Sequence, residues 1–250
     1  MFDTVTLLGV RVHAVTMAQT LAWAEAAVAA RIPRQICTAN PEFVMAAQRD
    51  REFLELLNRA DLVIPDGVGL LWAARRQGAR IPERVAGSDL IYRLAELGAR
   101  HGWRLYFLGA AEGVAQRAAE ALQAKYPGFV VAGAFSGSPR PEDNTALVAR
   151  VKAARPDVLM VAYGAPAQDK WIARNLNDLG VPLSMGVGGS FDFVTGVVPR
   201  APVWLQRLNL EWFYRLWKQP RRIRRIFTAV VGFPLAFLWR QWAPGGRRED

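Results

Sequence analysis

Ala60-Asp61-Leu62-Val63-Ile64-Pro65-Asp66-Gly67-Val68-Gly69-Leu70-Leu71-Trp72 is the stretch that determines the fold. An apolar run ends at Asp66, two glycines follow, and a new apolar periodicity begins at Val68, which predicts a strand, a tight turn and a helix. Gly67 and Gly69 lack a Cβ and would let backbone or substrate approach closely. Ligands of open α/β sheets bind at the carboxyl ends of the strands, so Asp66 is a candidate functional residue. The spacing leaves open that Asp66 instead caps the following helix.

Polar side chains also follow the preceding predicted strand. The segment Arg34-Gln35-Ile36-Cys37-Thr38-Ala39-Asn40-Pro41-Glu42 predicts a strand that ends at Thr38 to Asn40, then a helix that starts at Pro41 and runs to about Arg59. Strands that are consecutive in sequence are often neighbours in the sheet, so Thr38, Asn40 and Asp66 are expected to face one crevice. Asn40 has an alternative role as a helix cap or turn former.

Strands and helices alternate along the rest of the first 199 residues. Val5 to Val15 predicts a strand or small hairpin, and Ala18 to Ala30 predicts a helix. Further strands are expected at Trp103–Gly109, Phe129–Phe135, Asp157–Gly164 and Pro182–Gly188, with helices at Ala111–Tyr126 and Pro141–Ala154 and after Pro166. This alternation predicts an α/β fold, a Rossmann-like parallel sheet with helices on both faces.

Two loops add candidate binding residues. Ile81 to Asp89 is a polar loop that leads into a helix, which Ser88 or Asp89 would cap; Arg84 in this loop either reaches inward or is solvated. Gly109 follows a strand and precedes a helix, an arrangement that binds anions through backbone N–H groups. The third glycine of a dinucleotide fingerprint is missing, and the alternative is tight packing between the strand and the helix.

The composition is that of a globular protein, with 52% hydrophobic and 22% charged residues. Cys37 is the single cysteine and there are two histidines, so an internal disulfide framework and a Cys/His metal cluster are both excluded. A reducing cytoplasm fits this cysteine usage best. The first residues lack a basic region followed by a long apolar run, so no signal peptide is expected.

The positive charge is concentrated near the carboxyl terminus. Residues 1–199 contain 21 basic and 19 acidic side chains, whereas residues 200–250 contain 11 basic and 3 acidic ones and five of the nine tryptophans. Basic residues interleaved with tryptophan suit an anionic membrane interface. The sequence therefore predicts an α/β domain at 1–199 and a basic, amphipathic helical appendage at 200–250 that associates with a membrane.

The appendage contains an apolar segment from Ile226 to Trp239 that is too short to span a bilayer, since a span needs about 20 residues. It is expected to be an interfacial segment or a docked helix, and Val203 to Lys218 is expected to form short amphipathic helices. No recognition motif accompanies the arginines, so nucleic acid is not an expected partner.

Taken together, these segments resemble the WecG/TagA/CpsF glycosyltransferases over almost the whole chain. The motifs that carry the resemblance are Thr38-Ala39-Asn40-Pro41-Glu42, Ile64-Pro65-Asp66-Gly67-Val68-Gly69, Glu83-Arg84-Val85-Ala86-Gly87-Ser88-Asp89, Phe107-Leu108-Gly109, Gly164-Ala165-Pro166-Ala167-Gln168-Asp169-Lys170-Trp171, Gly186-Val187-Gly188-Gly189-Ser190-Phe191-Asp192, Arg200-Ala201-Pro202 and Leu210-Glu211-Trp212-Phe213-Tyr214-Arg215-Leu216. Two departures are Asp169, where the family usually has Glu, and Phe135-Ser136-Gly137, which replaces a more usual His-Gly-Tyr-Phe.

The resemblance implies transfer of a sugar from a UDP-sugar to a polyprenyl-diphosphate-linked saccharide in cell-surface polysaccharide synthesis, for example of an exopolysaccharide. It implies inversion to a β-linkage without a required metal or other cofactor, by a peripheral enzyme on the cytoplasmic face of the cell membrane. The donor sugar would be N-acetylmannosamine, its uronic acid or glucose. A homo-oligomer is compatible with the sequence.

The resemblance also assigns roles to the candidate residues. Asp66 would be the catalytic base, and substrate would be bound by Thr38, Asn40, Arg84, Gln168, Gly109 and Gly188. The acceptor diphosphate or lipid headgroups would be contacted by Arg215, Arg221, Arg222, Arg224 and Arg225. Two other hypotheses are a nucleotide-dependent oxidoreductase, suggested by Gly109, and a non-catalytic peripheral membrane binder, suggested by the charge of the appendage.

Overall fold

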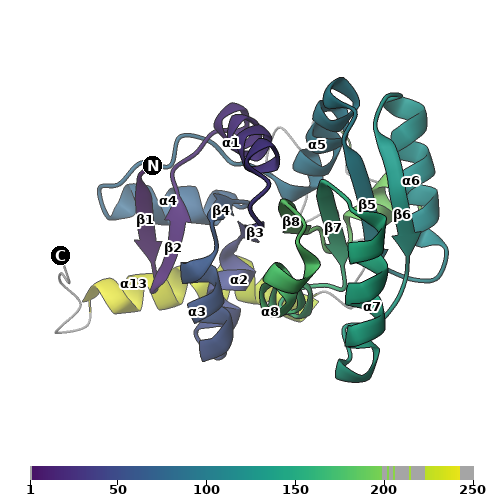
Figure 1. Ribbon diagram of the computed structural model, residues 1–250. Coiled ribbons are helices and arrows are strands. Elements are labelled where there is room, and N and C mark those ends of the chain that lie inside the picture. Colours follow the sequence, from purple (N-terminus) through teal and green to yellow (C-terminus); the bar gives the residue numbers. More distant parts are fainter. Residues whose placement is uncertain (1, 199–201, 203–204, 206–213, 215–222, 243–250) are drawn as a thin grey trace.

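The computed structural model describes residues 2–198, 202, 205, 214 and 223–242, and it has a six-stranded parallel sheet at its centre (Figure 1). The strand order is β4-β3-β8-β7-β5-β6. The strands are β3 (Arg34–Ala39), β4 (Leu62–Pro65), β5 (Arg104–Gly109), β6 (Val130–Phe135), β7 (Val158–Ala162) and β8 (Leu183–Gly186). The predicted α/β fold with a parallel sheet is confirmed.

Helices cover both faces of the sheet, as the alternation of strands and helices predicts. One face is covered by α1 (Met17–Ala30), α5 (Gly87–His101), α6 (Val114–Lys125) and the short α9 (Ser190–Val194). The other face is covered by α2 (Pro41–Ala47), α3 (Arg51–Arg59), α7 (Pro141–Ala154) and α8 (Ala167–Leu179). A further helix, α4 (Val68–Arg76), packs against the N-terminal hairpin.

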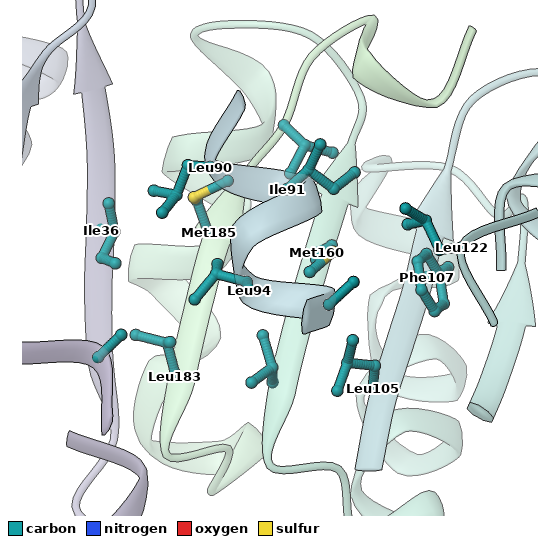
Figure 2. Close-up of a cluster of buried hydrophobic side chains, with 14 of the residues drawn as sticks. Ile36, Leu90, Ile91, Leu94, Leu105, Phe107, Leu122, Met160, Leu183 and Met185 are labelled. Atoms are coloured by element: carbon teal, nitrogen blue, oxygen red, sulfur yellow. The ribbon is translucent and has the colours of Figure 1, made fainter. Parts of the chain in front are cut away.

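The two cores follow from the alternation of side chains along each strand. Leu105 and Phe107 of β5 point into the core beneath α5 and α6, whereas Tyr106 and Leu108 point to the face covered by α7 and α8. Figure 2 shows Leu90, Ile91 and Leu94 of α5 in front of β8 and β7, between Ile36 of β3 and Phe107 of β5. Strands buried on both faces read as continuous apolar runs, which is why these were recognisable in the sequence.

The segment Val5 to Val15 contains a hairpin, one of its two predicted forms. Its strands β1 (Thr4–Leu7) and β2 (Val10–His13) are antiparallel and lie beside β4, the edge strand of the large sheet (Figure 1). The Nδ1 of His13 accepts a hydrogen bond from the backbone N–H of Val63 at 3.0 Å. The hairpin therefore covers the edge and provides an acceptor for a backbone donor of β4.

Two predicted helix boundaries were wrong. The single helix expected from Pro41 to Arg59 is two helices, because the Asp50 side chain accepts the N–H of Phe53 at 3.1 Å and caps a second helix. The helix expected from Ala111 begins at Val114, since Ala110 and Gly113 have positive φ values that are incompatible with a right-handed helix.

Residues 223–242 form one irregular helical segment, coloured yellow in Figure 1. It consists of α12 (Ile223–Phe227), a π-helical turn η2 (Thr228–Gly232) and α13 (Phe233–Trp242). Pro234 has no backbone N–H to donate, and such interruptions of a helix are commonly accommodated by a wider turn. Phe233 and Phe237 are buried in the core shared by α2, α4 and the hairpin, so α13 is a docked helix. The predicted helices from Val203 to Lys218 lie outside the described residues.

Within the described parts of the chain, no helix combines the length and the apolar character that crossing a membrane requires.

Candidate active site

A cavity of about 840 Å³ lies at the carboxyl ends of the parallel strands. Residues that follow β3, β4, β5, β7 and β8 line it, together with the start of α5 and part of the C-terminal segment. They include Thr38, Asn40, Glu42, Asp66, Arg84, Ser88, Ala110, Tyr163, Gln168, Gly188, Asp192 and Arg225. The strand ends of an α/β sheet are where ligands of this architecture bind.

Asp66 is held at the amino end of α5. Its Oδ2 accepts the backbone N–H of Gly87 at 3.0 Å, and its own N–H donates to the carbonyl of Ala39 at 2.7 Å. The N-cap residue of α4, the helix that follows, is Gly67 and not Asp66. The positive end of the α5 dipole stabilises negative charge on this carboxylate.

The N-terminus of α5 is not capped in the way that the sequence predicted. Neither Ser88 nor Asp89 caps the helix, which begins at Gly87 without a side-chain cap from its own N-cap residue. A Cβ on Gly87 would stand 2.9 Å from the Thr38 Cγ2 and 3.3 Å from the Asp66 Oδ2. A glycine at this position therefore lets α5 start directly against the Asp66 carboxylate.

The glycines that follow Asp66 make room for the ring of Pro41. A Cβ on Gly67 would stand 2.7 Å from the Pro41 Cδ, and one on Gly69 would stand 2.8 Å from the Pro41 Cγ. Real Cβ atoms essentially never approach other atoms this closely. The two glycines thus allow α2 and α4 to start side by side at the cavity.

Thr38 and Asn40 line the same cavity as Asp66. The side chain of Thr38 is nearly buried at the end of β3. The Oδ1 of Asn40 accepts the N–H of Phe43 at 2.9 Å, so Asn40 is the N-cap of α2. The capping role considered for Asn40 is therefore present, and the residue also faces the crevice.

Gln168 is 2% exposed and connects two turns of the cavity wall. Its Oε1 accepts the N–H of Gly164 at 3.1 Å, after β7, and the N–H of Gly188 at 2.9 Å, after β8. A Cβ on Gly186 would stand 2.4 Å from the Gln168 Nε2, so only glycine admits this side chain. Gln168 thus positions the backbone of the wall.

Gly109 serves packing between strands. Its φ is +103°, and a Cβ would stand 2.8 Å from the carbonyl carbon of Ala162 on β7. The next residue, Ala110, donates its N–H to the Ala162 oxygen at 2.9 Å and lines the cavity, whereas Gly109 is not among the lining residues. The close contact of Gly109 is thus with a neighbouring strand, and not with the following helix as the packing alternative expected.

Arg84 and Arg225 bring positive charge to the cavity from two distant parts of the chain. Arg84 is partly buried in the loop before α5. Arg225, in α12, forms an ion pair with Glu42 in the first turn of α2. Arg224 lies in the same α12 helix. Three other predicted cationic contacts, Arg215, Arg221 and Arg222, lie outside the described residues.

Glu42 and Asp192 are cavity residues that were not singled out from the sequence. Both lie within motifs that carry the family resemblance, Glu42 directly after Pro41 and Asp192 at the end of the Gly186 to Asp192 stretch. Their place in these motifs is the feature of the sequence that could have identified them as candidate site residues. Among the described residues, the cavity lining therefore has three carboxylates, those of Glu42, Asp66 and Asp192.

Asp169, next to Gln168, is fully buried behind the cavity wall rather than lining it. Burial raises the pKa of its carboxyl from 3.8 to about 7. Burial also raises the pKa of the nearby Cys37 thiol, with a further contribution from the Asp169 carboxylate. In the described residues, no group of three or more His, Cys, Asp or Glu side chains is arranged to hold a metal ion.

Comparison with known proteins gives a consistent result. The model of the glycosyl transferase WecG/TagA/CpsF family matches residues 5–247. An N-acetylglucosaminyldiphosphoundecaprenol N-acetyl-β-D-mannosaminyltransferase of Bacillus subtilis (strain 168) is 35% identical over 198 residues, which are 79% of this chain and 77% of the relative. Enzymes of the same description are 34% identical in Bacillus spizizenii, over 77% of this chain and 74% of the relative, and 35% identical in Staphylococcus aureus (strain NCTC 8325), over 76% of each.

Proposed function

This chain belongs to the WecG/TagA/CpsF family of glycosyl transferases, and we propose that it transfers N-acetylmannosamine from its UDP derivative to polyprenyl-diphosphate-linked N-acetylglucosamine. The sugars and the lipid-linked acceptor follow the names of the relatives, which describe an N-acetylglucosaminyldiphosphoundecaprenol acceptor and a β-D-mannosaminyl product. The UDP donor and the inverting course are our inference from the family resemblance and the chemistry of the cavity.

In this proposal Asp66 is the base. Its carboxylate takes the proton of the acceptor hydroxyl, the hydroxyl oxygen forms a bond to the anomeric carbon, and the bond from that carbon to the UDP oxygen breaks on the opposite face. One displacement of this kind inverts the anomeric configuration. The observation that carries the assignment is the fixed position of Asp66 in the cavity, held by the N–H of Gly87.

The departing diphosphate needs positive charge or N–H dipoles. Arg84 and Arg225 line the cavity and supply charge, and the turn that contains Gly188 is held in place by Gln168. Thr38 and Asn40 stand beside Asp66 and present polar groups to a sugar. An oxidoreductase function has less support, because Gly109, the residue that suggested it, lies against Ala162 and is not among the described residues that line the cavity.

We also propose that residues 200–250 associate with the cytoplasmic face of the membrane. On the described part, large apolar side chains are exposed along one stripe: Ile223, Phe227, Val231, Leu235, Trp239 and Trp242. The first five of these residues are spaced by four and would drift around an α-helix of 3.6 residues per turn, and the wider η2 turn offsets part of that drift. An apolar helical stripe with tryptophans suits the membrane interface.

The test is UDP release by the purified protein with N-acetylglucosaminyl diphosphate linked to a lipid and a panel of UDP-sugars. We expect release with UDP-N-acetylmannosamine and a β-linked product. Asp66→Asn should lower kcat by at least 100-fold while the protein stays folded. Asp178→Asn, the same substitution at an exposed site on α8, is the matched control. Undiminished turnover by Asp66→Asn would remove Asp66 from the role of base.

A further inference from the structure

The cavity has an apolar half that the proposed chemistry does not use. Its lining comes from α2, α4 and the C-terminal segment and comprises Phe43, Val68, Trp72, Ile226, Ala229, Val230 and Pro234. The polar half, with Asp66 and Arg84, lies at the strand ends and the start of α5. Sugar hydroxyls and phosphates match the polar half only.

Two valines in the apolar half remain exposed. Val68 is 40% exposed at the first position of α4, and Val230 is 41% exposed in η2. These two elements are brought together by α13, which contacts both α4 and η2 and whose Phe233 lies against Gly69 of α4. Exposed apolar side chains inside a concave site indicate an apolar ligand.

The apolar half is also continuous with the exposed stripe. The cavity side of the C-terminal segment has Ile226, Val230 and Pro234, and the stripe has Phe227, Val231 and Leu235, each one position later. Residues one position apart lie on adjacent faces of a helix. A flexible apolar chain leaving the cavity along this segment therefore meets the stripe.

We propose that the apolar half of the cavity binds the isoprene units nearest the diphosphate of the acceptor lipid; this subsite rests on the proposed function. The acceptor has three parts in a fixed order, sugar, diphosphate and polyprenyl chain. The cavity presents matching groups: the Asp66 carboxylate for the sugar hydroxyl, the arginines 84 and 225 for the diphosphate, and the apolar wall for the chain. The rest of the chain continues past the stripe into the bilayer.

The experiment compares N-acetylglucosaminyl diphosphate acceptors that bear a methyl or a geranyl group, in solution without membranes or detergent. With wild-type protein, the geranyl acceptor should have a KM at least tenfold lower than the methyl acceptor, because each buried CH₂ favours binding. In Val230→Asn this preference should fall below about threefold. Val130→Asn makes the same substitution at an exposed valine of β6 that does not line the cavity, and it should keep the full preference.

The outcomes separate the two proposals. Equal KM values for the two acceptors in wild-type protein, or a preference unaffected by Val230→Asn, would overturn the isoprene subsite and leave the transferase function intact. If no donor reacts with either acceptor, the transferase function fails, and calorimetry with geranyl and methyl diphosphate then tests the subsite alone. Tighter binding of geranyl diphosphate would support it, and equal binding would reject it.

Discussion

The side-chain oxygen of Gln168 accepts the backbone N–H of Gly188 at 2.9 Å, and this bond joins the first turn of α8 to the turn that follows β8. The same oxygen holds the N–H of Gly164 after β7. One buried amide therefore sets the relative position of two turns in the cavity wall. Backbone N–H groups in such turns act on a substrate only if their positions are fixed.

Gln168→Leu should lower kcat/KM about 10- to 100-fold, because it leaves two backbone N–H groups without their acceptor. The free energy of unfolding should fall by roughly 1–3 kcal/mol, measured by urea denaturation. Gln116→Leu replaces an exposed glutamine on α6 and should change neither quantity appreciably. Normal kinetics in Gln168→Leu would show that these turns need no support from Gln168.

Gly87→Ala should lower kcat about tenfold or more while the protein stays folded. The new methyl group would press on Thr38 and on the Asp66 carboxylate, and displacing a base by a fraction of an ångström slows proton transfer. Gly98→Ala is the control: it lies on the same helix, but its Cβ meets the Leu105 side chain, remote from the cavity. Steady-state kinetics and thermal unfolding of both variants distinguish a local effect on Asp66 from a general effect on α5.

Asp169→Asn should stabilise the protein at pH 8 by roughly 2 kcal/mol or more, and by much less at pH 5. The folded-state pKa of Asp169 is raised to about 7 from 3.8, so the folded protein binds this proton more tightly than the unfolded chain. The stabilising contribution of the protonated Asp169 carboxyl is therefore fully present below pH 4 and is lost as the pH rises through 7. Urea unfolding at both pH values measures the difference, and Asp178→Asn is the exposed control.

His13 should produce a pH dependence of the opposite sign. Burial and the neighbouring Arg11 lower the pKa of His13, while its Nδ1 accepts the N–H of Val63. The unfolded chain therefore binds this proton more readily, so stability is complete above pH 6.5 and is lost as the pH falls through the lowered pKa. His13→Asn keeps an acceptor but does not titrate, and it should flatten the slope of unfolding free energy between pH 7 and 5.

Phe237→Ala and Trp239→Ala should separate docking of α13 from membrane binding. Phe237 is buried against Trp72 and Phe233, so its truncation should cost about 3–5 kcal/mol in unfolding free energy. Trp239 is 75% exposed in the stripe, so its truncation should change stability little and should weaken sedimentation with anionic vesicles. Vesicle binding that is unaffected by Trp239→Ala would argue against the stripe as the membrane contact.

The sequence was sufficient to predict the sheet and the shared position of three polar residues. Continuous apolar strands and alternating helices indicate a parallel sheet, and consecutive strands β3 and β4 bring Thr38, Asn40 and Asp66 to one cavity. The contacts of Gly109 and Gln168 depend on the order of the strands in the sheet, which could not be derived from the sequence. Gly109 meets Ala162 because β5 pairs with β7, and Gln168 reaches Gly188 because β8 lies next to β7.

Local features were missed for a different reason. Asp50 interrupts an otherwise helical pattern, and the apolar periodicity before and after it concealed the cap that divides α2 from α3. The partner of Arg225 was not predictable, since Glu42 is 183 positions away and their contact depends on how α12 docks beside α2. Distant pairs of this kind are specified by packing and not by local sequence.

The π-helical turn η2 holds one residue more than an α-helical turn for nearly the same rotation, so it acts as a one-residue insertion in the C-terminal segment. Removing one residue between 228 and 232 would therefore restore an α-helical turn and leave Phe233 and Phe237 facing their core. Removing one residue between Phe233 and Phe237 would instead rotate Phe237 by about 100° out of that core. Among functional descendants of this sequence, single-residue deletions are therefore expected within η2 and are expected to be excluded from the first turn of α13.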